Sequence, residues 1–188
     1  MAQEGQSPKI MVIGCCDSRV DPTAIFDAGP GELFMVRNVA NLVPPYSTDK
    51  GHHGTSAAIE FAVGFLGVAH IVVMGHAICG GVAALMSGSA AAEGDGGNIG
   101  NWMSIAAPAL EKTLQGNLEV GTDAFARALE MAVVQLSLEN LRTFPMVRDA
   151  MAAGRLDLHG AWFSIETGDL HLMDHEGAAF RPVQLPVA

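Results

Sequence analysis

Three side chains that bind soft metal ions follow two apolar segments of the chain. Cys15 comes directly after residues 9–14 (KIMVIG), and His76 and Cys79 come after residues 69–75 (AHIVVMG). A histidine and a cysteine three positions apart can bind one ion, because a single turn brings their side chains together. Two cysteines, one histidine and an open fourth position are typical of catalytic zinc sites, whereas structural zinc sites have four protein ligands. The sequence therefore predicts Zn²⁺ bound by these three residues, with a bound water that performs the chemistry.

A charged pair lies next to the first of these ligands. Two thiolates neutralise the formal charge of Zn²⁺ and weaken its ability to acidify water, so a neighbouring group must favour bound hydroxide. Asp17 is placed to accept the hydrogen bond of a zinc hydroxide, and Arg19 is placed to hold Asp17 by a bidentate contact. Cys16 should point away from the metal, and we interpret it as a small buried packing residue.

The elements that must position these residues are short, buried strands. Residues 9–14, 33–39 and 69–75 are apolar runs rich in β-branched side chains, as expected of strands buried on both faces. In open α/β sheets, ligands collect beyond the carboxyl ends of the strands. If the strands at 9–14 and 69–75 are neighbours, Cys15 and the His76–Cys79 pair therefore meet at one edge of the sheet.

The rest of the chain alternates helices with loops and ends in a hairpin. We expect a helix from Pro22 with Asp21 as its N-cap, and a helix capped by Thr55 or Ser56. Further helices are expected after Gly80 and at residues 102–114, 123–141 (capped by Thr122 or Asp123) and 144–151, with a loop at 87–100. Strands at 156–165 and 170–173 form the hairpin. The predicted fold is a single α/β domain spanning residues 1–188, with a mostly parallel central sheet, an antiparallel edge strand and flanking helices.

Composition narrows the classes of function. A formal net charge of −10 argues against nucleic acid and anionic membrane surfaces as partners. No apolar stretch is long enough for a membrane span, and residues 1–9 lack the apolar core of a secretory signal. Three cysteines are too few for a disulfide framework, which favours a reducing, cytoplasmic location. The chain is 49% hydrophobic and only 16% charged, so part of its surface is expected to be buried against another copy.

Several motifs together resemble the β-class carbonic anhydrases, in particular the plant type. The resemblance runs from about residue 5 to residue 172, and paired motifs at these spacings are highly specific. The motifs are CCDSR at 15–19, RNVAN at 37–41, GHAICGG at 75–81, SLENL at 137–141 and HGAW at 159–162.

The resemblance implies reversible hydration of carbon dioxide to bicarbonate by a zinc-bound hydroxide. It implies Cys15, His76 and Cys79 as ligands and the pair Asp17–Arg19 as gatekeeper, with the open form of the site, in which Asp17 does not bind zinc. It further implies a substrate pocket formed by Gln6, Phe34, Val39, Phe61 and Gly80. Plain core packing explains the apolar members of this pocket about as well, and an exposed surface position explains Gln6.

The resemblance also implies a homodimer or higher homo-oligomer whose pocket residues cross the interface. Three features depart from the family pattern, of which one is Cys16, at a position where serine or alanine is more usual. Phe61 stands where plant-type members carry tyrosine, and almost nothing precedes Gly5, where family members carry helices that wrap a partner subunit.

Other functions remain open at this point. The same site would suit a hydrolase of carbonyl sulfide or carbon disulfide, and a catalytically silent zinc protein could act as a sensor or assembly subunit. A thiol redox role for Cys15 and Cys16 is disfavoured because the chain has no C-x-x-C pair. His52 and His53 lie in a loop and are either a proton relay or a plain polar pair.

Overall fold

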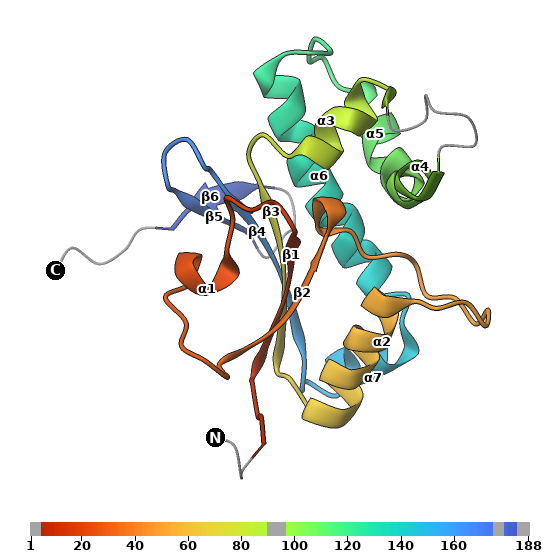
Figure 1. Ribbon diagram of the computed structural model, residues 1–188, viewed down its shortest axis with the longest axis vertical. Coiled ribbons are helices and arrows are strands. Elements are labelled where there is room, and N and C mark those ends of the chain that lie inside the picture. The colour runs from red at the N-terminus through yellow and green to blue at the C-terminus, as the bar shows by residue number, and fades with distance from the viewer. Residues whose placement is uncertain (1–4, 90–96, 175–178, 184–188) are drawn as a thin grey trace, which may run out of the picture.

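A six-stranded sheet forms the centre of the computed structural model, which describes residues 5–89, 97–174 and 179–183 (Figure 1). Its strand order is β2-β1-β3-β4-β5-β6. The strands are β1 (Ile10–Cys15), β2 (Leu33–Asn38), β3 (His70–His76), β4 (Asp157–Phe163), β5 (Leu170–Met173) and β6 (Phe180–Pro182). The first four strands pair in parallel, and β5 and β6 pair antiparallel. The predicted fold class is confirmed, although β6 was not predicted and adds a second antiparallel strand.

The two strands that carry the candidate ligands are direct neighbours. β1 pairs with β3 in parallel, from Ile10 opposite His70 to Gly14 opposite Met74. Because parallel strands end at the same edge of a sheet, Cys15 and His76 emerge side by side. The condition on which the predicted metal site depended is thereby met.

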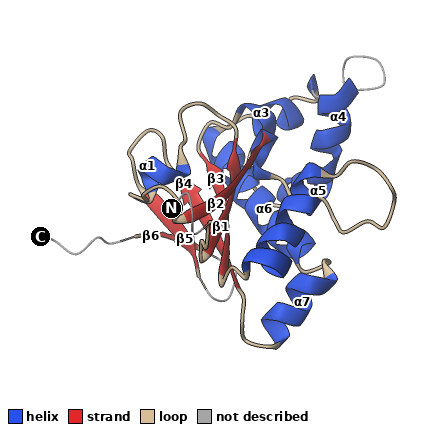
Figure 2. Cartoon of the chain, turned by 60° about the horizontal axis from the view of Figure 1, so that its bottom comes forward, coloured by secondary structure: helices blue, strands red, loops and turns tan. Residues whose placement is uncertain are grey.

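Helices lie on both faces of the sheet, with most of them on one side (Figure 2). They are α1 (Pro22–Ile25), η1 (Val39–Asn41), α2 (Gly54–Glu60), η2 (Phe61–Leu66), α3 (Gly80–Met86), α4 (Gly97–Met103), η4 (Ser104–Ala106), α5 (Ala107–Leu114), α6 (Asp123–Leu141) and α7 (Pro145–Ala152). Asp21 caps α1 by accepting from the backbone N–H of Thr23, and Thr122 caps α6 by accepting from that of Phe125. Both caps agree with the prediction.

Two helix predictions and one loop prediction were wrong in detail. The helix expected to start after Thr55 or Ser56 begins at Gly54, with His53 at the N-cap and no side-chain capping bond, and it continues without a break into the π-helix η2. The expected loop at 87–100 is partly helical because α4 starts at Gly97, and residues 90–96 lie outside the described part. The helix expected at 102–114 is divided, since Pro108 occupies the first turn of α5, the position where a missing N–H costs least.

The core is divided by the sheet into unequal parts. On one face, the β1 residues Met11 and Ile13 are fully buried against α2 and α6, where Ile59 and Val134 are also fully buried. On the other face, a smaller cluster around Val12 and Met74 is covered mainly by α1. None of the helices in the described ranges is both long and apolar enough to cross a membrane.

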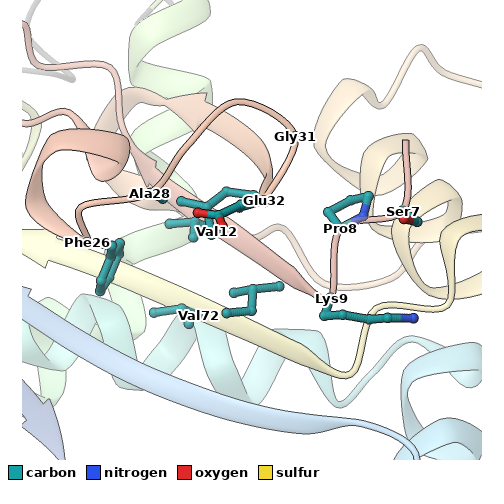
Figure 3. Close-up of a pocket in the computed structure, with 11 residues that line it drawn as sticks. Ser7, Pro8, Lys9, Val12, Phe26, Ala28, Gly31, Glu32 and Val72 are labelled. Carbon is teal, nitrogen blue, oxygen red and sulfur yellow. The ribbon is translucent and has the colours of Figure 1, made fainter. Parts of the chain in front are cut away.

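The thinly covered face carries a mainly apolar groove of about 600 Å³ (Figure 3). Val12 and Val72 form its floor, Phe26 lies near one end, and Lys9 and Ser7 lie at the other. The candidate metal ligands do not line this groove. It is thus separate from the cluster described next.

Candidate metal centre

Cys15, His76 and Cys79 come together in the structure as the sequence predicted. Cys15 ends β1, His76 ends β3, and Cys79 occupies the N-cap of α3. Their potential ligand atoms all lie within 4.8 Å of one another, and all three residues are buried. Asp17 is not part of this cluster, which consists of residues that the structure describes.

The positions of the donor atoms fit a zinc ion. The two sulfur atoms lie 4.0 Å apart, and two sulfurs on a tetrahedral zinc, each at about 2.3 Å from it, would lie about 3.8 Å apart. The Nδ1 atom of His76 lies 2.8 Å from the carbonyl oxygen of Ala77, so an N–H at this position can donate to it and leave Nε2 as the acceptor. Nε2 is buried and has no hydrogen-bond partner in the described part of the chain. One buried nitrogen without a hydrogen-bond partner and two thiols together form a donor set that suits zinc.

The two thiols affect each other's protonation. The hydrogen bond with Cys79 lowers the pKa of Cys15 to about 4, and the same contact raises the pKa of Cys79. Without a cation, the pair therefore keeps one proton between two sulfurs. A divalent ion would replace that proton, because it binds cysteine as thiolate.

Asp17 and Arg19 form the predicted bidentate ion pair beside the ligands. The Nε atom of Arg19 donates to Oδ1 of Asp17 at 3.0 Å, and its Nη2 atom donates to Oδ2 at 2.8 Å. The backbone N–H of Arg19 also donates to Oδ1, at 3.0 Å. These hydrogen bonds hold the pKa of Asp17 well below its usual range, so the carboxylate stays ionised and accepts hydrogen bonds only.

Arg37 holds the backbone on which this pair is built. Its Nε atom donates to the carbonyl oxygen of Cys15 at 2.9 Å, and its Nη2 atom donates to those of Asp17 at 2.6 Å and Val20 at 2.8 Å. Arg37 is the first residue of the RNVAN motif at 37–41, and no role was predicted for it from the sequence. Its contacts show that it fixes the loop after β1 from the neighbouring strand β2.

Two of the predicted pocket residues lie at the ligand edge of the sheet. Gly80 directly follows the candidate ligand Cys79 and begins α3. Val39 packs closely on α3, since a Cβ atom at Gly81 would lie 2.9 Å from its Cγ1 atom. Val39 also lines a cavity of about 860 Å³ together with His52 and His53.

The other three predicted pocket residues lie toward the opposite edge. Gln6 precedes the first residue of β1, whereas Cys15 is its last. Phe34 pairs with Met11, four residues before the pairing of Asn38 with Cys15, which corresponds to about 13 Å along a strand. Phe61 contacts Phe34, with ring centroids 5.9 Å apart. One copy of the chain therefore does not bring Gln6, Phe34 and Phe61 to its own ligands.

The interpretation of Cys16 was wrong, and one polar residue was missed. Cys16 is exposed and not buried, because β1 ends at Cys15 and little packs on the next residue. The missed residue is Glu130 on α6, a buried acid whose carboxylate accepts from the backbone N–H of Cys79 at 3.2 Å. The sequence held a signal for it, since Glu130 interrupts the apolar face on which Val134 and Leu138 lie.

Comparison with known sequences shows a consistent similarity. A family model described as carbonic anhydrase matches residues 10–170. A curated relative, β-carbonic anhydrase 5 of Arabidopsis thaliana, named as chloroplastic, is 41% identical over 162 residues, which are 86% of this chain and 52% of the relative. The chain thus spans about half the length of that relative.

Comparison with solved structures shows the same similarity. The structure of the β-carbonic anhydrase CcaA is 30% identical with a TM-score of 0.88, and the match covers 98% of this chain and 82% of that one. A structure from a study of two tetrameric β-carbonic anhydrases of Sordaria macrospora is 34% identical with a TM-score of 0.72, covering 90% of this chain and 82% of that one. The match to CcaA thus extends over nearly the whole of this chain.

Proposed function

The chain belongs to the β-carbonic anhydrase family, and we propose that it catalyses the reversible hydration of carbon dioxide to bicarbonate and a proton. The observation that carries this proposal is the clustering of Cys15, His76 and Cys79 within 4.8 Å, next to the ionised pair Asp17–Arg19. A structural zinc site would need a fourth protein ligand and would have no use for an acceptor held beside it.

The proposed mechanism assigns a role to each residue of this edge. When bound, zinc supplies a water molecule acidic enough to act as a nucleophile near neutral pH. The ionised carboxylate of Asp17 would accept an O–H from a water held there and so orient that water toward the substrate. Arg19 prevents Asp17 from turning toward the ligands, because it binds both carboxylate oxygens. Val39 gives the substrate an apolar wall, and the backbone N–H of Gly80 is a donor for a product oxygen.

We propose that His52 or His53 passes the released proton to buffer. Both line the cavity that reaches Val39, and an imidazole exchanges protons readily near neutral pH. His53 is tied to the Oδ1 atom of Asp49 at 2.6 Å, which leaves His52 as the freer ring of the two.

We propose a homodimer in which a second copy completes the pocket with Gln6, Phe34 and Phe61. The distance of these residues from the ligands of their own chain supports this arrangement. Phe61 and Phe65 stack at 5.5 Å and are 42% and 75% exposed, which is unusual for phenylalanine and suits a buried contact between copies. The tetrameric state of the two Sordaria proteins also supports self-association.

We infer a reducing location, the cytoplasm, from the state of the thiols. All three cysteines are free, and the proposed metal site requires two of them. Retention of zinc in reducing buffer and its loss under mild oxidation would support this inference.

The test of the proposed function is stopped-flow CO₂ hydration together with metal analysis on the same sample. We expect about one zinc per chain and a hydration rate that falls when a chelator removes the metal and returns when zinc is added. One zinc per chain without hydration would instead favour the silent zinc protein. Hydrolysis of carbonyl sulfide in the absence of CO₂ hydration would favour the hydrolase.

A further inference from the structure

Glu130 is a buried acid that the proposed mechanism does not use. It lies in the middle of α6 and is 4% exposed. Its Oε1 atom accepts from the backbone N–H of Cys79 at 3.2 Å, and its Oε2 atom accepts from the indole Nε1–H of Trp162 at 3.0 Å. Acids are almost never buried without partners, and here one of the two partners is the backbone of a candidate ligand.

The same peptide group is held from its other end by Arg19. The carbonyl oxygen of Ile78 and the N–H of Cys79 belong to one peptide unit. Arg19 donates to this oxygen at 3.0 Å, and Glu130 accepts from this N–H. A cation on the oxygen and a carboxylate on the N–H both follow the peptide dipole, and hydrogen bonds of this charge-assisted kind are the stronger ones. The peptide is therefore clamped between two opposite charges.

The backbone at this peptide is in an unfavourable conformation. Ile78 has a φ of 55°, the left-handed region, which a β-branched residue rarely adopts. Its side chain is 57% exposed, so packing of the side chain does not explain the conformation. Hydrogen bonds to the peptide are the contacts available to maintain it.

Close packing fixes the distance between α6 and this loop. A Cβ atom at Gly75 would lie 2.7 Å from Cγ2 of Val134 and 3.6 Å from the backbone oxygen of Glu130. The end of β3 therefore lies directly against the turn of α6 that carries Glu130.

We propose that Glu130 is a positioning residue for the metal centre. It orients the Ile78–Cys79 peptide from the side opposite Arg19, and so sets both the sulfur of Cys79 and the carbonyl group that anchors Arg19. This inference rests on the proposed metal site. It states that Glu130, which is not itself a ligand, sets the position of the ligand Cys79.

The experiment compares variants that differ in what they offer to the Cys79 N–H. E130L has no acceptor and leaves this N–H unpaired. E130Q/W162F has one amide oxygen and, because the indole donor is gone, the Cys79 N–H as its remaining partner. W162F alone is the background for the double variant, and E139L, at an exposed position of the same helix, is the matched control.

Zinc affinity measured by chelator competition is the first readout. We expect E130L to bind zinc about 10- to 100-fold more weakly than wild type, the range found when partners of metal ligands are removed. We expect E130Q/W162F to return close to the affinity of W162F, and E139L to match wild type. The absorption of the cobalt-substituted proteins is the second readout, since the thiolate-to-cobalt and visible bands of E130L should shift as the Cys79 sulfur moves.

The outcomes separate this inference from the function on which it rests. Failure of the wild type to bind zinc would overturn both. Normal zinc binding by the wild type, together with wild-type affinity and cobalt spectrum in E130L, would overturn the role of Glu130 alone. If E130L and E130Q/W162F bound zinc equally weakly, the role of Glu130 would also be overturned, because a general loss of packing would then explain both variants.

Discussion

Arg19 affects both the pKa and the orientation of the Asp17 carboxylate, and only the effect on orientation matters near neutral pH. Free aspartate has a pKa of about 3.9, and the contacts with Arg19 lower the pKa of Asp17 further. Removal of Arg19 would raise the pKa of Asp17 toward that ordinary value, which is still far below neutral pH. The charge of Asp17 therefore does not depend on Arg19 under assay conditions, whereas its orientation does.

We expect R19A to reduce CO₂ hydration by about 10- to 100-fold, by the same factor at pH 6.5 and pH 8.5. Stopped-flow rates at both pH values, with zinc content measured alongside, check this. D21N is a suitable control, because asparagine caps a helix as well as aspartate. A loss that grows as the pH falls would show that Asp17 takes up a proton and would contradict the proposed role of Arg19.

The two loop histidines allow a separate prediction about proton release. In H52A/H53A we expect CO₂ hydration to fall severalfold in dilute buffer and to recover as the buffer concentration rises, since external buffer replaces the relay. H70A is the control, because His70 contacts His159 and lies at the start of β3, away from the cavity. Unchanged turnover of H52A/H53A in dilute buffer would contradict proton transfer by either histidine.

At the scale of secondary-structure elements, the contact between β3 and α6 sets the relative positions of His76 and Cys79. Gly75 permits this contact, since its missing Cβ atom leaves room for Val134. The strand delivers His76, and the helix delivers Glu130 to the backbone of Cys79. A shift of the helix would therefore move one ligand relative to another.

We expect G75A to lower the free energy of unfolding by about 1–3 kcal/mol, the usual cost of overpacking, and to weaken zinc retention. G75A/V134A should recover part of both losses, because the second change removes the methyl group that the new Cβ atom meets. Urea unfolding and chelator competition measure the two effects. G64A serves as control, since nothing lies within 4 Å of its added Cβ atom. Wild-type stability in G75A would show that α6 can shift to accommodate the added Cβ atom. It would contradict the claim that close packing at Gly75 fixes α6 against β3.

The molecule as a whole presents an aromatic patch that we place between two copies. The patch consists of Phe34, Phe61 and Phe65, on β2 and η2. In a twofold interface the same patch occurs on both copies, so one substitution changes the contact twice. The predicted pocket residues Phe34 and Phe61 belong to this patch, so the proposed dimer would link assembly to activity.

We expect F65D to convert the assembly to monomers in analytical ultracentrifugation and to reduce CO₂ hydration at least tenfold, since two like charges would face each other in the contact. Zinc content should stay at wild-type level, because Cys15, His76 and Cys79 come from one chain. L118D, at an exposed leucine outside this patch, should change neither property. A fully active F65D monomer would contradict the completion of the pocket by a second copy.

Local sequence determined the strands β1 to β5, the capped helices α1 and α6, and the three candidate ligands, because these depend on apolar runs, capping residues and strand ends that short segments encode. It could not determine that Glu130 reaches Cys79, since this contact joins residues 51 positions apart and depends on how closely α6 approaches β3 at Gly75. It also could not place Gln6 and Phe34 relative to Cys15. The direction and register of β1 and β2 decided that these residues lie toward the amino ends of the strands, while the ligands lie at the carboxyl ends.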